Sequence, residues 1–285
     1  MMKKILAKAY IWILLILLYA PLVFIAVFSF TESRVMGSWT GFSTQLYTNL
    51  FTGSMQGSGA LLSAIKNTLL IALVSSTVSM LLGTVAAIGI YNLKGRRKAA
   101  MQFLNNIPMI NPDIITGVSL FLLFVFLRVS QGYVSVILAH ITFGTPYVVL
   151  SVMPRLTQMN PNIYEAALDL GATPFLALRK ALIPELRPGM LSGFILAFTM
   201  SLDDFAVTFF TRGTVGLDTL STYIYTDARK GGLTPELRPL MTLIFAVILV
   251  LLLIINIRKA KQMKEIRKDE KIRKYSAGSG HSYRL

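Results

Sequence analysis

Long apolar stretches without ionisable side chains dominate the chain. An α-helix needs about 20 mainly apolar residues to cross a membrane, and six stretches of the sequence reach that length. Four stretches hold no Asp, Glu, Lys or Arg, and two hold only one or two aspartates: residues 9–30, 67–93, 129–154 and 239–257, then 101–127 and 188–211. The pattern predicts an all-α membrane protein with six transmembrane helices, near 9–30, 65–91, 103–127, 133–153, 189–210 and 239–257.

The six spans predict three parts of the chain. Residues 1–60 hold the first transmembrane helix and an exterior segment. Residues 61–257 hold the other five helices and a long cytoplasmic segment, of which 160–187 is the informative part. Residues 258–285 form a basic tail. The first apolar stretch is longer than the h-region of about 7–15 residues in a cleaved signal peptide, so we expect it to remain as a membrane anchor.

Composition and charge agree with a membrane protein. Hydrophobic residues make up 54% of the 285 residues and charged residues 14%, and the net charge is +15. Residues 1–8, the loop 94–98 and the tail contribute +3, +4 and +7, and all three lie on one side if six spans alternate. Basic residues collect on the cytoplasmic side of membrane proteins, which predicts that both termini are cytoplasmic. The basic tail is also expected to attract the head groups of anionic membrane lipids. No nucleic-acid partner is indicated.

The third predicted span contains a break. Pro108 and Pro112 stand four residues apart near its start, and two such prolines cannot both fit a regular helix without loss of backbone hydrogen bonds. Either the backbone is broken at membrane depth against protein or water, or the span begins later, near Asp113. Both interpretations place this span against the helix bundle.

The sequence holds no recognisable catalytic constellation. It lacks a phosphate-binding G-x-x-x-x-G-K-[ST] loop, it has no cysteine, and its two histidines, His140 and His281, cannot build a metal site. No cofactor, no metal and no enzymatic activity are expected. A process driven by ATP would take its ATPase from another chain. His140, alone in the fourth span, is expected to be a hydrogen-bond partner between helices.

Residues 160–189 predict two short helices joined by a sharp elbow. Asn160 and Pro161 favour the start of a helix, and Gly171 suits the left-handed residue that ends one. Thr173 and Pro174 repeat the start signal, so a second helix over about 174–182 takes a new direction. Pro184 and Pro188 are expected to close that helix. The first helix is too short to persist alone in water, and it must dock against something.

This segment resembles the EAA motif of ABC-importer permeases. The resemblance rests on Glu165-Ala166-Ala167, on Gly171 and on Pro184, with Ala181 and Ile183 at two positions where the motif has Ile and Leu. In that family the segment forms coupling helices that sit in a cleft of the cytoplasmic ATPase. The resemblance therefore implies ATPase-coupling residues, namely Glu165, Ala166, Ala167, Leu170, Gly171 and Pro184.

Most of the chain is similar to spermidine/putrescine permeases of the PotC type. The similar stretches are 29–34, 39–42, 111–114, 140–143, 201–205 and 234–236. The resemblance implies a multi-pass permease subunit of a type I ABC importer (MetI-like fold) in the bacterial inner membrane, with polyamines as cargo. It also implies two ATPase copies, a second permease and an exterior substrate-binding protein. Related permeases carry iron, thiamine, opines or phosphonates, so these cargoes remain the alternative.

Three carboxylates stand in or beside the predicted spans. Asp203 and Asp204 lie in the fifth span and Asp113 in the third, while the central parts of the spans hold no Lys or Arg. An intramembrane carboxylate usually faces a cavity, a partner or a substrate path. Neighbours on a helix diverge by about 100°, so one aspartate is expected to face the path and the other to bond a neighbouring helix. The candidate substrate-path residues are Asp203, Asp204, Phe205 and Asp113, with helix locking as the alternative.

Two other functional classes fit the sequence less well. A membrane-embedded hydrolase could use Asp203 and Asp204 as its carboxylate pair, but adjacent side chains on a helix point apart. A self-contained channel does not need the two-helix elbow. Copurification of an ATPase would separate both from a permease.

Overall fold

The computed structural model describes residues 2–54, 57–214, 216–230 and 233–250, with residues 253, 254 and 257. Every regular element in this part of the chain is helical. The basic tail at 258–285 and residues 251, 252, 255 and 256 of the sixth predicted span lie outside the described residues. The helices are α1 Met2–Phe28, α2 Gln45–Thr52, α3 Ser58–Asn92, α4 Gly95–Ile110, α5 Asp113–Phe126, α6 Tyr133–Gln158, α7 Ile163–Asp169, α8 Pro174–Ala177, the π-helical turn η1 Leu178–Leu182, α9 Ile183–Asp203, α10 Ala206–Thr211, α11 Leu220–Arg229 and an unlabelled helix Leu237–Val250.

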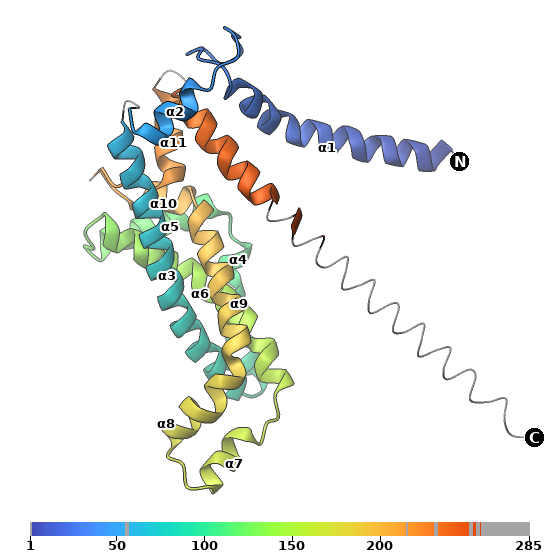
Figure 1. The fold of residues 1–285 in the computed structure, drawn as a ribbon. Helices are drawn as coiled ribbons and strands as arrows, with labels where there is room; N and C mark the ends of the chain where they lie inside the picture. The colour runs from blue at the N-terminus through green and yellow to red at the C-terminus, as the bar shows by residue number, and fades with distance from the viewer. Residues whose placement is uncertain are drawn as a thin grey trace, which may run out of the picture. The chain divides into compact units, whose positions relative to one another are not determined.

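The chain forms two compact units. The larger unit is Gly57–Asp227, and the smaller unit joins Met1–Gln56 to Ala228–Leu285. In the larger unit α3, α6 and α9 pack side by side, with α7 and α8 at one end of this bundle and α11 at the other (Figure 1). Val148, Val152 and Leu186 are fully buried in its core.

One buried arginine connects the two sequence segments of the smaller unit. Arg238 is 0% exposed, and its guanidinium donates hydrogen bonds to the carbonyl oxygens of Ser33 (2.8 Å) and Arg34 (3.1 Å). These contacts tie the start of the helix Leu237–Val250 to the loop that follows α1. Residues about 200 positions apart in sequence are therefore joined inside this unit.

Four helices are long and apolar enough to cross a membrane. They are Lys8–Phe28, Ser58–Asn92, Tyr133–Gln158 and Pro174–Asp203. A fifth candidate is the pair α4 and α5, which meet at a bend of 107°, and the helix Leu237–Val250 is shorter but apolar. The all-helical class is confirmed. The count of six spans and the cytoplasmic location of the termini stay predictions.

The third predicted span is broken. α4 ends at Ile110 and α5 begins at Asp113, so Asn111 and Pro112 form the break. Pro108 lies inside α4, whereas Pro112 precedes α5, where its missing N–H breaks no helical hydrogen bond. The polar half of the third predicted span lies in α4, which is itself a helix and meets α5 at a bend of 107°. The break is therefore confirmed, and α5 begins at Asp113, so both interpretations of where the span enters the membrane stay open.

The prediction that Pro184 and Pro188 close a helix is wrong. The helix that begins at Pro174 continues through both prolines to Asp203, as one element of 30 residues. The π-helical turn makes this possible, because the N–H of Ile183 donates to the carbonyl of Leu178, five residues back. The wider turn changes the hydrogen-bond register just before Pro184, which has no N–H to offer.

The fifth predicted span is also not continuous to residue 210. α9 ends at Asp203, and Asp204 has extended backbone angles (φ −61°, ψ 131°) before α10 begins at Ala206. The two predicted carboxylates therefore stand at a helix break.

Candidate functional site: a carboxylate-lined cavity and a two-helix elbow

A cavity of about 820 Å³ lies around the break between α9 and α10. Its wall combines carboxylates with aromatic rings, and none of the described residues that line it is Lys or Arg. The lining comes from α5, α6, α9, α10 and α11 together with the break itself: Pro112, Asp113, Ile114, Phe143, Met200, Asp203, Asp204, Phe205, Ala206, Val207, Phe209, Phe210 and Tyr225. All four candidate substrate-path residues from the sequence meet in this one wall.

Asp204 is held by the helix that follows it. Its carboxylate accepts hydrogen bonds from the backbone N–H groups of Val207 (3.2 Å) and Thr208 (2.8 Å), and from the Thr208 hydroxyl (2.8 Å). These N–H groups belong to the first turn of α10, which has no helical acceptor for them. A carboxylate at a helix N-terminus is also favoured by the helix dipole. Asp204 therefore stabilises the start of α10.

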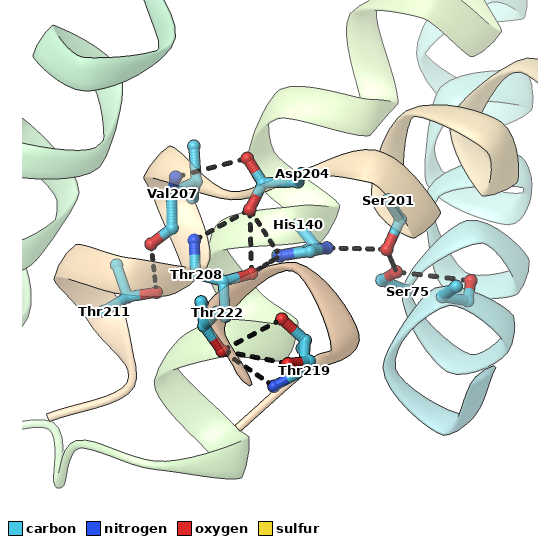
Figure 2. A network of polar contacts seen from close by, with 10 residues as sticks. Ser75, His140, Ser201, Asp204, Val207, Thr208, Thr211, Thr219 and Thr222 are labelled. Atoms are coloured by element: carbon cyan, nitrogen blue, oxygen red, sulfur yellow. Dashed lines mark hydrogen bonds and ion pairs between the residues drawn. The ribbon is translucent and has the colours of Figure 1, made fainter. Parts of the chain in front are cut away.

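A buried histidine connects this turn to the neighbouring helices (Figure 2). The side chain of His140 lies in α6 with its Nε2 2.9 Å from the Thr208 hydroxyl and 3.4 Å from the Asp204 carboxylate. Its Nδ1 lies 2.6 Å from the hydroxyl of Ser201 in α9, which lies 3.3 Å from the hydroxyl of Ser75 in α3. The network links α3, α6, α9 and α10, and the predicted role of His140 as a hydrogen-bond partner between helices is confirmed.

The two adjacent aspartates have different surroundings, as predicted, but the cause is the break after Asp203 and not the angle between neighbours on one helix. The side chain of Asp204 is 7% exposed and bonded to α10, whereas Asp203 is exposed at the cavity wall. Asp113 is also exposed there, as the first residue of α5. Asp203 and Asp113 are therefore the carboxylates accessible to a molecule in the cavity. The role of the cavity as a substrate path stays a prediction.

The aromatic part of the wall is larger than the sequence predicted. Phe205, Phe209 and Tyr225 form a cluster, with ring centroids separated by 4.6 Å (Phe205–Tyr225), 5.3 Å (Phe205–Phe209) and 5.7 Å (Phe209–Tyr225). Tyr225 lies on α11, and Phe143 lies on α6. Sequence reasoning missed both, because neither stands near the Asp-Asp pair in sequence and no local motif marks them.

The elbow in the cytoplasmic segment forms as predicted. Gly171 has φ +84°, and the N–H groups of Gly171 and Ala172 donate to the carbonyls of Leu168 (2.8 Å) and Ala167 (3.1 Å). This is the hydrogen-bond pattern in which a left-handed residue ends a helix. Thr173 then accepts a hydrogen bond from the N–H of Leu176 (3.4 Å) at the start of α8. The first helix begins two residues later than predicted, since Asn160 accepts from Asn162 N–H (3.0 Å) in a turn before it.

The elbow exposes apolar side chains. Leu170 is 89% and Phe175 70% exposed, and Glu165 and Ala166 are exposed beside them, whereas Ala167 is half-buried. Behind the two short helices lies a second cavity of about 460 Å³, lined by residues of α3, α6, α7 and α8 that include Tyr91, Tyr164 and Glu165. Large apolar side chains that are exposed close together are typical of a surface that another protein covers.

The comparisons with known proteins agree with this geometry. Residues 79–259 match the family model described as "Binding-protein-dependent transport system inner membrane component". The chain is 36% identical over 238 residues to the putrescine transport system permease PotI of Escherichia coli K12, covering 81% of this chain and 82% of that protein. It is 35% identical over 249 residues to the spermidine/putrescine permease PotC of Haemophilus influenzae, covering 87% and 94%.

Solved structures show the same fold at low sequence identity. A bacterial ABC transporter that imports alginate matches with a TM-score of 0.63 at 13% identity, over 90% of this chain and 96% of that chain. The MetNI methionine ABC transporter in an inward-facing conformation matches with a TM-score of 0.54 at 22% identity, over 67% and 90%. The fold is thus the type I ABC importer permease fold, and the chain belongs to the family of inner-membrane components of binding-protein-dependent transport systems.

Proposed function

We propose that this permease carries polyamines across the membrane. The observation that carries the proposal is the identity of 35–36% to permeases named for putrescine and spermidine, over four fifths or more of the chain. The cavity at the helix break supports it, because a polyamine has ammonium groups separated by short alkyl chains. A wall of carboxylates and aromatic rings without a basic residue suits that chemistry.

The carboxylates of the wall and two of its rings have roles in this proposal. Asp203 and Asp113 pair with ammonium groups, since an unpaired cation in a membrane cavity is costly. The rings of Phe205 and Phe209 contact the alkyl chain and attract ammonium groups through their faces. Asp204 acts indirectly, because it holds the turn that places Asp203 and Phe205 in the wall.

The elbow is the surface on which we propose that the ATPase docks. ATP hydrolysis takes place in a separate ATPase, present in two copies, and this permease pairs with a second, different permease. An exterior binding protein delivers the cargo. The exposed Leu170 and Phe175 enter the ATPase cleft, with Glu165 and Ala166 beside them.

The continuous helix from α8 to α9 supports a mechanical link between the two sites. At 1.5 Å per residue, the 30 residues Pro174–Asp203 span about 45 Å. One end joins the elbow and the other ends at the cavity wall. A displacement of α8 by the ATPase is therefore passed on to Asp203 through one unbroken helix, in which the π-helical turn and the two prolines are the places where it can bend. The cavity behind α7 and α8 gives those helices room to move.

Uptake measurements test the cargo. The permease would be produced with its ATPase, second permease and binding protein in cells that lack polyamine uptake. Accumulation of labelled putrescine or spermidine is expected, and it should require ATP and each partner. Excess unlabelled diamine or triamine should compete, whereas iron, thiamine, opines and phosphonates should not. Competition by one of those cargoes, with no polyamine uptake, would replace the proposal with the corresponding alternative.

A further inference from the structure

An arginine stands directly behind the aromatic wall of the cavity. Arg212 follows α10, and its guanidinium carbon lies 5.3 Å from the centre of the Phe209 ring. Phe209 lines the cavity, and the side chain of Arg212 is only 17% exposed. A charge in this partly buried position is weakly screened by salt. The field of Arg212 therefore reaches a molecule in the cavity.

The charge of Arg212 is compensated by Asp218. The two side chains form an ion pair and are also hydrogen-bonded to each other. Without this carboxylate, a guanidinium would stand one ring away from the place where a cationic cargo binds. The guanidinium already lies over one face of Phe209, since aromatic faces attract cations in general.

Asp218 is held in place independently of Arg212. Its carbonyl accepts a hydrogen bond from the Asn67 side chain in α3 (2.9 Å), and its carboxylate accepts one from the Thr222 hydroxyl in α11 (3.1 Å). The next turn is fixed to α3 as well, because Leu220 N–H donates to the Thr68 hydroxyl (2.8 Å). The carboxylate is therefore prearranged as a counter-ion and does not depend on the ion pair for its position.

We propose that Asp218 is a specificity-determining residue, which neutralises Arg212 and so keeps the cavity attractive to multiply charged cations. The inference rests on the proposed function, because it requires a cationic cargo. Its distinguishing consequence concerns charge: a cargo with three positive charges is affected by an uncompensated Arg212 more than a cargo with two. A pair that served only to tie the ends of helices together would affect all cargoes equally.

Three variants of the complete transporter separate these possibilities. Asp218→Asn keeps an oxygen for the Thr222 hydroxyl and removes the negative charge. Repulsion by Arg212 should lower the uptake rate at saturating cargo by about threefold for a diamine and about tenfold for a triamine. Arg212→Gln should keep the wild-type rate or exceed it. The double variant should return to within about twofold of wild type, because the uncompensated charge is gone.

Asp218→Glu, which keeps the charge, is the matched control, and rates are normalised to assembled complex. The inference would be overturned if the uptake rate fell by the same factor in Arg212→Gln, Asp218→Asn and the double variant, and equally for both amines. That result would mean that the ion pair only holds the helices together. If Asp218→Asn does not assemble, a loss of rate in Arg212→Gln would overturn it, and assembly with normal rate in the double variant would support it. If the wild-type transporter takes up neither amine, the proposed function is refuted and this inference with it. If the wild-type transporter takes up both amines and the variants have the same uptake rates, this inference alone is refuted.

Discussion

Asp203 and Asp204 are neighbours in sequence that differ in what their carboxylates contact. The extended backbone at Asp204 ends α9 and turns its side chain onto the first turn of α10 and toward His140. Asp203, still helical, remains exposed at the cavity wall. One backbone break therefore gives two identical side chains different surroundings: Asp204 is bonded to α10, and Asp203 is accessible in the cavity, where we propose that it contacts cargo.

Replacement of Asp204 should destabilise the protein. In Asp204→Ala, the N–H groups of Val207 and Thr208 and the Thr208 hydroxyl lose their acceptor in a buried place. Buried polar groups left without partners cost about 1–3 kcal/mol. We expect the thermal unfolding midpoint of the purified complex to fall by several degrees, as measured by tryptophan fluorescence in detergent. Asp203→Ala is the matched control and should leave the midpoint unchanged; an equal decrease in both variants would argue against this division of tasks.

At the scale of elements, the bundle of α3, α6 and α9 is held together by close contacts at glycines. A Cβ atom added to Gly83 in α3 would lie 2.6 Å from the Cβ of Val148 in α6, and one added to Gly193 in α9 would lie 3.0 Å from the Val148 Cα. Small residues at such crossings let helices in membranes approach closely. Val148 is fully buried between the two glycines.

Two alanine substitutions in the same helix test this packing. Gly83→Ala should force α3 and α6 apart and lower the yield of assembled complex, with an expected cost of about 1–3 kcal/mol from overpacking. Gly89→Ala lies in α3 with no atom within 4 Å of the added Cβ, so it should be neutral or slightly stabilising through helix propensity. The measurement is the amount of monodisperse complex from equal membranes. Similar yields for the two variants would show that the close contact at Gly83 does not hold the bundle.

Local signals in the sequence were sufficient to predict the elbow but not the helix that follows it. Gly171 and the Thr173-Pro174 pair determine their own backbone, so their effect could be predicted without knowledge of the fold. Pro184 was expected to end a helix, yet the helix continues through it, because a π-helical turn at Leu178–Leu182 precedes the proline. That outcome depends on the packing of α9 against α3 and α6, which no local pattern encodes.

The candidate site shows the same division. The different surroundings of Asp203 and Asp204 were predicted from helix geometry but arise from the helix break after Asp203, whereas the polar role of His140 followed from its isolation in an apolar span. The contribution of Tyr225 to the wall depends on the contact between α10 and α11. A contact between two helices is a property of the tertiary structure, which no local pattern marks.

At the scale of the whole molecule, one helix connects the elbow, where we propose that the ATPase docks, to the cavity that we propose as the cargo path. The elbow at Gly171 sets the angle between α7 and α8, and α8 continues to Asp203. ATP-driven movement of the elbow would thus tilt the helix whose far end forms the cavity wall. We propose that transport uses such a rigid-body transition, in which a small displacement at one end changes access at the other.

Substitutions at Gly171 test whether the elbow couples ATP hydrolysis to transport. Its φ of +84° disfavours side chains, although no neighbouring atom would meet an added Cβ, so the effect of a substitution is conformational and not steric. Gly171→Val should distort the elbow by a strain of about 1–3 kcal/mol and uncouple ATP hydrolysis from transport. Gly171→Asn, a residue that tolerates the left-handed region, should retain coupling. The ratio of cargo imported to ATP hydrolysed in proteoliposomes is the measurement, and a normal ratio in the valine variant would remove the elbow from the mechanism.

The most direct test of the central claim is polyamine uptake by Asp203→Asn. The amide keeps the shape of the side chain and removes its charge. An ion pair at 4 Å with an effective dielectric constant near 20 is worth roughly 4 kcal/mol before desolvation, and if a quarter of it survives, the rate falls about fivefold. We therefore predict that uptake of labelled spermidine or putrescine, normalised to complex purified from the same membranes, falls about fivefold while the amount of complex is unchanged. Wild-type uptake by Asp203→Asn would contradict the assignment of this cavity as the path of a polyamine.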